Sequence, residues 1–94
     1  MAKTRTFSIN SAAYSAITVQ SQCKRVRVAE DGSSGVTTDL LIKIPDESAD
    51  AIRITMGLEF LIEKSTGFFE ATKVVGYVKT VSGTVTARQV EDYT

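Results

Sequence analysis

The stretch from Val74 to Val90 constrains the fold more than any other part of the chain. Two alternating runs rich in β-branched residues flank Ser82-Gly83. A two-residue loop with glycine at a position of positive φ suits the turn between antiparallel strands. The sequence therefore predicts a C-terminal hairpin that turns at Ser82-Gly83. In this register Tyr77 faces Arg88 on one side, and the other side forms the core, with Gly76, Val78, Thr80, Val85, Ala87 and Gln89.

The composition favours strands throughout. Valine and isoleucine number seventeen against four leucines, and twelve threonines join them. β-Branched residues pack well on a pleated sheet and are less suited to helices. Strand-like segments recur at spacings of roughly 8 to 12 residues, which is typical of a small sandwich or barrel. We therefore expect an all-β fold: a single domain over 1-94, an antiparallel β-sandwich or barrel of seven to eight short strands.

The remaining segments can be assigned from alternation and turn residues. Residues 1-10 are predicted to form an extended arm or an edge strand, and residues 91-94 a frayed tail. A bulge or break is expected near Cys23-Lys24, where the apolar positions change phase. Leu40 and Ile42 point inward in a strand that Pro45 closes, and the segment from Ile52 to Met56 favours a strand over a short helix.

The residue types exclude most enzymatic chemistry. The chain has no histidine and one cysteine, so a histidine-based triad and a cysteine zinc site are both excluded. Asp46, Glu47 and Asp50 lie in a polar loop, where solvated acids are favoured over an acid–base pair or a calcium site. We expect no catalytic residue, no cofactor and no metal. We also expect no membrane contact and a chain made and kept in a cytosol, because no apolar run is long enough for a signal peptide or a span.

Charge is unevenly distributed along a neutral chain. The first 29 residues hold five basic and no acidic residues, and the remainder holds six basic and eleven acidic ones. Neutralisation of one half by the other, within the fold or between subunits, is favoured over binding to a polyanion. The alternative is a basic contact surface for nucleic acid, with Tyr77 beside Arg88 as a stacking platform. Its candidate residues are Lys3, Arg5, Lys24, Arg25 and Arg27.

Several apolar residues fall on faces opposite the main apolar rows. A two-sheet sandwich needs only one inward face in each sheet. The additional outward apolar residues predict a protein contact surface. The alternative is that they are apolar residues scattered over the surface. Tyrosine and arginine are favoured interface anchors. The candidate protein-contact residues are Leu41, Leu61, Val75, Tyr77, Lys79 and Arg88.

Two stretches carry a resemblance to a known class of proteins. One is the run from Val26 to Gly32 followed by Thr37 to Leu41, and the other runs from Val75 to Gly83 and ends at Gln89-Val90-Glu91. In order and spacing they resemble small virion structural proteins of tailed bacteriophages, the short all-β chains that decorate or cement the head shell. The resemblance implies a non-enzymatic homo-oligomer, located in the virion, that binds the major capsid protein or other virion proteins.

Two other classes of function fit the same composition. A fibre, baseplate or glycan-binding β module would bind a component of a host surface. A small barrel that binds single-stranded nucleic acid would lose affinity as the salt concentration rises.

Overall fold

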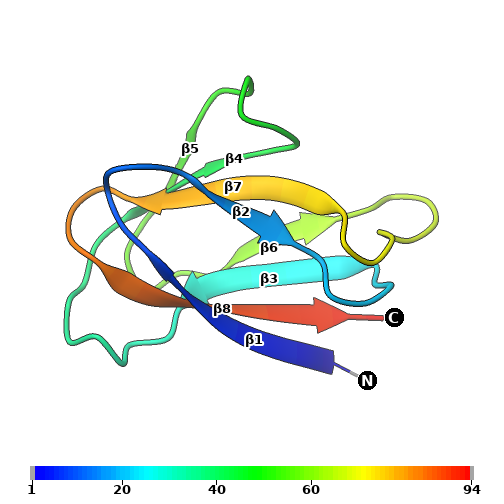
Figure 1. Cartoon of the computed structure of the whole chain (residues 1–94), viewed down its shortest axis with the longest axis horizontal. Helices are drawn as coiled ribbons and strands as arrows, with labels where there is room; N and C mark the ends of the chain where they lie inside the picture. Colours follow the sequence, from blue (N-terminus) through cyan, green and yellow to red (C-terminus); the bar gives the residue numbers. More distant parts are fainter. Residues whose placement is uncertain (1, 94) are drawn as a thin grey trace.

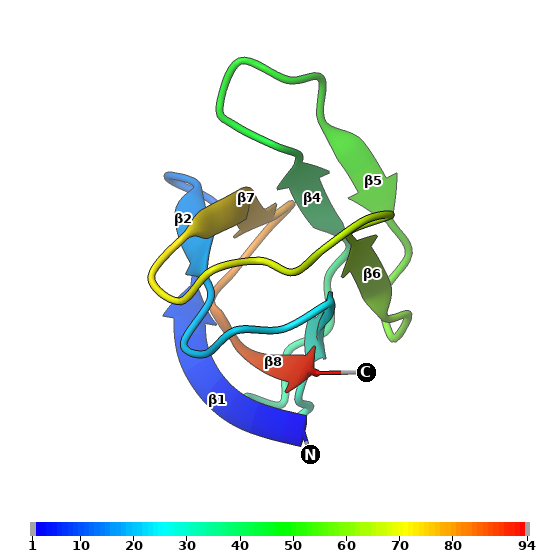
Figure 2. The same ribbon diagram turned by 90° about the vertical axis from the view of Figure 1, so that its right-hand side faces the viewer.

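The computed structural model describes residues 2–93 and contains two four-stranded antiparallel sheets (Figure 1). One sheet has the order β1-β8-β3-β6 and the other β2-β7-β4-β5. Figure 2 shows the two sheets as opposed layers, which confirms the predicted all-β sandwich. The strands are β1 (Ala2–Ile9), β2 (Ser15–Thr18), β3 (Arg25–Glu30), β4 (Leu40–Lys43), β5 (Ile52–Ile54), β6 (Phe60–Glu63), β7 (Val74–Thr80) and β8 (Val85–Asp92).

The predicted C-terminal hairpin is wrong in its pairing. The chain does turn at Ser82-Gly83, and Gly83 has the expected positive φ of 77°. However, β7 pairs with β2 and β4, whereas β8 pairs with β1 and β3. Tyr77 therefore lies beside Ala16 and Lys43, and Arg88 lies beside Thr6 and Ala29 in the other sheet. The turn carries the chain from one layer to the other (Figure 1).

Hydrogen bonds at the end of β7 explain why the strands separate. The backbone N–H of Thr80 donates to the Asn10 carbonyl, and that of Val81 donates to the Asp39 carbonyl. The N–H of Ser82 donates to the Thr38 hydroxyl. Segments outside β8 accept the hydrogen bonds of these three donors. The turn at Ser82-Gly83 therefore does not require backbone hydrogen bonds between β7 and β8.

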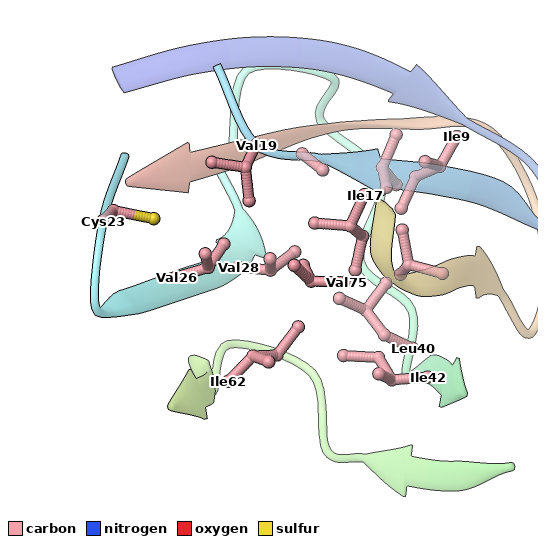
Figure 3. Packing of buried hydrophobic residues seen from close by; sticks show 13 residues of the cluster. Ile9, Ile17, Val19, Cys23, Val26, Val28, Leu40, Ile42, Ile62 and Val75 are labelled. Atoms are coloured by element: carbon pink, nitrogen blue, oxygen red, sulfur yellow. The ribbon is translucent and has the colours of Figure 1, made fainter. Parts of the chain in front are cut away.

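The core lies between the two sheets and follows the predicted alternation. Val78 and Thr80 of β7 and Ala87 and Gln89 of β8 are fully buried, as expected for the row assigned to the core. Figure 3 shows Ile17, Val28, Leu40 and Ile42 pointing into the same interior. The face assignment was right because alternation fixes which side of a strand is apolar, whichever strand lies beside it.

Val75 departs from this alternation. It was expected to share an outward face with Tyr77, but it is 4% exposed and belongs to the core (Figure 3). The register between β2 and β7 shifts at this point, because Ile17 pairs with Gly76 and Thr18 with Val74. Val75 is the extra residue of a β-bulge, and a bulge redirects a side chain to the other face. Val75 therefore does not share an outward face with Tyr77.

The two ends of the chain also differ in part from expectation. β1 is the edge strand of its sheet, one of the two alternatives for residues 1-10. The tail expected to fray instead continues β8 through Asp92, and Glu91 is 2% exposed. Tyr93 stacks on Phe68 with ring centroids 4.9 Å apart. Met1 and Thr94 lie outside the described residues.

The predicted break at Cys23-Lys24 and the strand before Gly57 are both confirmed. β2 ends at Thr18, and Cys23 forms an isolated bridge with Phe69 before β3 begins. Cys23 is a buried core residue. β5 is a strand, and Gly57 has a positive φ of 81° in the turn that follows it.

Candidate protein-contact surface

The outer side of the sheet β2-β7-β4-β5 gathers three of the predicted contact residues. Because Leu40, Ile42 and Val78 point into the core, their strand neighbours point outward. The strand registers place Tyr77 beside Lys43, and Lys79 beside Leu41, which in turn pairs with Arg53. We call this surface the β7 face; its residues are Ala16, Leu41, Lys43, Arg53, Tyr77 and Lys79.

The β7 face is basic. Its strands contribute Lys43, Arg53 and Lys79, and their sequences contain no aspartate or glutamate. Acids adjoin the face at two places: the Asp39 carboxylate lies 2.8 Å from Arg53 Nε, and Lys43 Nζ donates to the Glu47 carbonyl of the acidic loop between β4 and β5 at 3.0 Å. The Asp39 contact is an ion pair, whereas the Lys43 contact is to a backbone oxygen. The Arg53 contact, followed by the backbone N–H of Met56, lowers the pKa of Asp39 below its usual value. Through Lys43 and Lys79, the strands of the face keep a net positive charge after Asp39 offsets Arg53.

Tyr14 joins this surface from the loop between β1 and β2. Lys43 Nζ lies 4.7 Å and Lys79 Nζ lies 4.9 Å from the centroid of the Tyr14 ring. A cation over an aromatic face gains about 0.5 to 1 kcal/mol at an exposed site. The two contacts hold both lysines near one ring and concentrate positive charge at the centre of the face. The sequence around Tyr14 does not indicate the two lysines, because both lie far along the chain from it.

The other predicted contact residues do not join the β7 face. Leu61 and Arg88 lie on the outer side of the opposite sheet, where Leu61 pairs with Arg27 and Arg88 with Ala29. Val75 lies in the core. The predicted set is therefore divided, and only Leu41, Tyr77 and Lys79 share one face. Arg88 was misplaced by the incorrect hairpin, Val75 by the bulge in β7, and Leu61 because β6 joins the opposite sheet.

The basic residues near the start of the chain do not form an open basic stripe. Arg25 Nε lies 2.9 Å from Glu63 Oε2, and Arg27 Nε lies 2.9 Å from Asp92 Oδ2. Both acids come from the acidic part of the chain. The two halves therefore neutralise each other within the fold at these positions, as the favoured interpretation expected. Such partly exposed ion pairs each contribute at most about 1 kcal/mol.

The three other basic residues of the predicted basic surface have different surroundings; they are Arg5, Lys3 and Lys24. The Arg5 guanidinium donates to Gln89 Oε1 from Nε at 3.2 Å and from Nη2 at 3.1 Å, and it lies 4.5 Å from the Phe7 ring. Lys3 is exposed near the start of β1, and Lys24 is half-buried just before β3. Arg5 thus serves the sandwich interior, in contrast to the predicted basic contact.

A polar network inside the sandwich went unrecognised in the sequence. Gln89 and Glu91 follow Val85 and Ala87 in the inward row of β8, and both are buried. Glu91 accepts hydrogen bonds from the backbone N–H groups of Gln20 and Ser21 at 2.8 and 3.0 Å. Buried charges persist where such donors satisfy them. The network fastens the segment between β2 and β3, which is a structural role.

Cys23 lies close to this network. Burial, followed by the charges of Glu91 and Asp92, raises the pKa of its thiol to about 11. A thiol of this kind stays protonated at neutral pH and is a poor nucleophile. Cys23 is therefore a core residue in chemistry as well as in position.

The acidic loop predicted to be solvated is exposed at Asp46, Glu47 and Asp50. Hydrogen bonds from the Ser48 hydroxyl and backbone N–H lower the pKa of Asp46. A lowered pKa keeps the carboxylate ionised, which is the opposite of what a general acid needs. Among residues 2–93 no group of three or more histidine, cysteine or acidic side chains is placed to hold a metal ion.

A groove of about 460 Å³ opens beside β6 and the start of β7. Apolar residues, among them Ile44, Ile62 and Val75, line it, and its charged residues are two glutamates and two lysines (Glu63, Glu70, Lys64 and Lys73). The balanced rim favours neither an anion nor a cation. Of the predicted contact residues, it includes Val75 alone.

No helix in the described part of the chain is long and apolar enough to cross a membrane. Comparisons of the chain with models of known protein families, with curated proteins and with solved structures gave no match.

Proposed function

We propose that the chain is a non-enzymatic structural protein of a phage virion, which decorates or cements the head shell and binds it through the β7 face. The observation that carries this proposal is the gathering of Leu41, Tyr77 and Lys79 on one outer face whose strands contain no acid. Together with the resemblance of the two sequence stretches, it supports a protein-binding role. The complementary partner is an acidic patch on the shell.

The residues of the β7 face divide into an anchor and a charged surround. Tyr77 and Leu41 are half-buried on the outer side of the sheet, so each has surface left to bury against a partner. Aromatic residues placed in this way supply much of the binding energy of protein interfaces. Lys43, Lys79 and Arg53 attract an acidic partner and accelerate its association, an effect that salt screens.

Exposed apolar residues continue beyond the face at the β5 edge. Met56 is 49% and Leu58 is 58% exposed in the turn after β5, and the Met56 N–H donates to Asp39, the partner of Arg53 on the face. Large exposed apolar side chains rimmed by polar residues mark contact sites. We assign them to the same interaction, as the part of the surface that loses most contact with water on binding.

Binding of single-stranded nucleic acid is the second candidate, favoured by one observation. Two tyrosines, Tyr14 and Tyr77, lie among three cationic side chains on the same face. Single-strand-binding proteins combine aromatic platforms with a positively charged groove. Both lysines already occupy the neighbourhood of the Tyr14 ring, which leaves less of it for a base. A protein partner is therefore the better fit.

The experiment is co-sedimentation of the purified chain with head shells assembled from the shell protein of the same genome. Tyr77→Ala and Lys79→Glu each remove a feature of the β7 face and should weaken binding, by about tenfold or more for an interface anchor. Arg88→Glu is the matched control, because Arg88 lies on the opposite sheet. Binding of single-stranded DNA by the same sample, with steep loss at high salt, would favour the second candidate instead.

A further inference from the structure

β1 presents a long backbone edge that no other strand covers. It pairs with β8 over eight residues in unbroken register, and nothing in residues 2–93 pairs with its opposite edge. In Figure 1 the strand forms the lower rim of the sandwich. An uncovered edge of this length is a template for pairing with another strand.

The other three edge strands are protected in ways that β1 is not. β5 has three residues, and β2 and β6 have four each. The register of β2 is also interrupted by the bulge at Val75. Short length and bulges are the devices by which proteins prevent edge pairing. β1 contains no proline and no register shift.

The charged side chains of β1 do not block its free edge. Arg5 donates to Gln89 Oε1, which holds its guanidinium toward β8. Lys3 lies near the end of the strand, away from its centre. The central stretch of the edge is therefore open.

The ladder geometry identifies which residues offer hydrogen bonds at this edge. The N–H of Asp31 donates to the carbonyl of Thr86, so Thr86 directs its backbone groups toward β3. Successive residues alternate in direction, so Val85, Ala87 and Gln89 bond to β1 through Ile9, Phe7 and Arg5. The residues between them, Thr4, Thr6 and Ser8, direct their backbone N–H and C=O groups to the free edge.

We propose that this edge pairs with β1 of a second copy of the chain, in an antiparallel two-fold dimer centred on Thr6. In this register Thr6 lies opposite Thr6, and Thr4 lies opposite Ser8. Arg5 lies opposite Phe7 of the second copy, and Arg5 already stacks on its own Phe7 ring at 4.5 Å. The sheet β1-β8-β3-β6 of one copy and the same sheet of the second copy then form one continuous sheet of eight strands.

A neighbouring register is disfavoured by charge. Centring the two-fold axis on Arg5 would also pair outward-directed backbone groups, but it would place Arg5 directly opposite Arg5. Like charges directly opposite each other destabilise a strand pair. Centring the axis on Phe7 would leave Thr4 without a partner in the other β1, whereas the Thr6 register pairs Thr4, Thr6 and Ser8. The substitutions below are designed for the Thr6 register.

Sedimentation velocity over a wide range of protein concentration tests the proposal. The wild-type chain should pass from monomer to dimer as its concentration rises. Thr6→Pro removes the N–H at the centre of the new ladder and should weaken the dimer by about tenfold or more. It should leave the monomer folded, because that N–H does not bond to β8.

A charge pair at the same position provides a test that does not depend on proline. Thr6→Lys should dissociate the dimer, and an equimolar mixture of Thr6→Lys and Thr6→Asp should restore it as a heterodimer. Thr84→Lys, an exposed threonine outside β1, is the control and should behave as wild type. A chain that stays monomeric at every concentration would overturn the proposal. A dimer unaffected by the Thr6 substitutions would do so too.

Discussion

The Gln89 side-chain amide donates a hydrogen bond of 2.8 Å to the Glu91 carboxylate inside the sandwich, where both side chains are buried. Gln89 also donates to the Thr18 carbonyl and accepts from Arg5. The middle of β1 and the ends of β2 and β8 are therefore joined by one polar network, although β8 lies far from the other two strands in the sequence.

Loss of the Glu91 carboxylate should destabilise the fold substantially. Glu91→Ala removes the acceptor of the part-buried N–H groups of Gln20 and Ser21 and of the buried Gln89 amide, and an unsatisfied buried group costs about 1 to 3 kcal/mol. We expect the free energy of unfolding in urea to fall by about 3 kcal/mol. Glu63→Ala removes an exposed ion pair and should cost about 1 kcal/mol or less. Equal losses for the two variants would contradict the role of the network.

Gly76 should not tolerate a side chain. A Cβ at this position would lie 2.9 Å from the Lys43 carbonyl oxygen and 3.3 Å from Ile44 Cγ1. The nearer atom belongs to the backbone, so relief requires β4 and β7 to shift, and overpacking of this kind costs about 1 to 3 kcal/mol. We expect Gly76→Ala to lower the urea midpoint of unfolding. An unchanged or raised midpoint would contradict this prediction, because it would show that β4 and β7 can move apart at little energetic cost.

The alternation of the sequence predicted burial better than it predicted pairing. Val78 and Ala87 were assigned to the core correctly, because an inward side chain is apolar whether the strand lies beside its sequence neighbour or opposite it. The same pattern therefore could not distinguish a hairpin from a turn between two layers. That distinction depends on distant partners such as Asn10 and Asp39, which accept hydrogen bonds from the end of β7.

The candidate contact surface was predictable only in part, for the same reason. Tyr77, Lys79 and Leu41 were selected as outward residues, and they do lie on one face. Arg88 was added to them through the incorrect hairpin. Tyr14 was missed because its relation to Lys43 and Lys79 arises from the packing of a loop on the sheet. Glu91 was missed because acids near a chain end ordinarily remain solvated.

Stability should decline at alkaline pH through Cys23. Its pKa is raised from 9.0 to about 11, so the folded state holds the proton more tightly than the unfolded state does. The contribution of this thiol is complete below pH 9 and is lost as the pH rises from about 9 to 11. Urea unfolding of wild type and Cys23→Ala across this range should show a steeper decline for wild type. Parallel curves for the two proteins would refute this assignment.

Asp39 should fasten β5 to the sheet in a pH-dependent way. Its carboxylate contacts Arg53 and accepts the N–H of Met56 at 2.8 Å, which lowers its pKa. A lowered pKa means that the contribution is present above the usual value of 3.8 and is lost as the pH falls through the folded-state pKa. Asp39→Asn should speed amide exchange at Met56 and in β5 without affecting β8. Unchanged exchange in β5 would contradict this role.

The most direct test of the central claim is the binding of the chain to head shells from the same genome, measured for wild type, Tyr77→Ala and Arg88→Glu. Our account predicts that wild type and Arg88→Glu sediment with the shells and that Tyr77→Ala does so at least about tenfold more weakly. Failure of the wild-type chain to bind, or equal loss in both variants, would contradict the assignment of the β7 face as the contact surface.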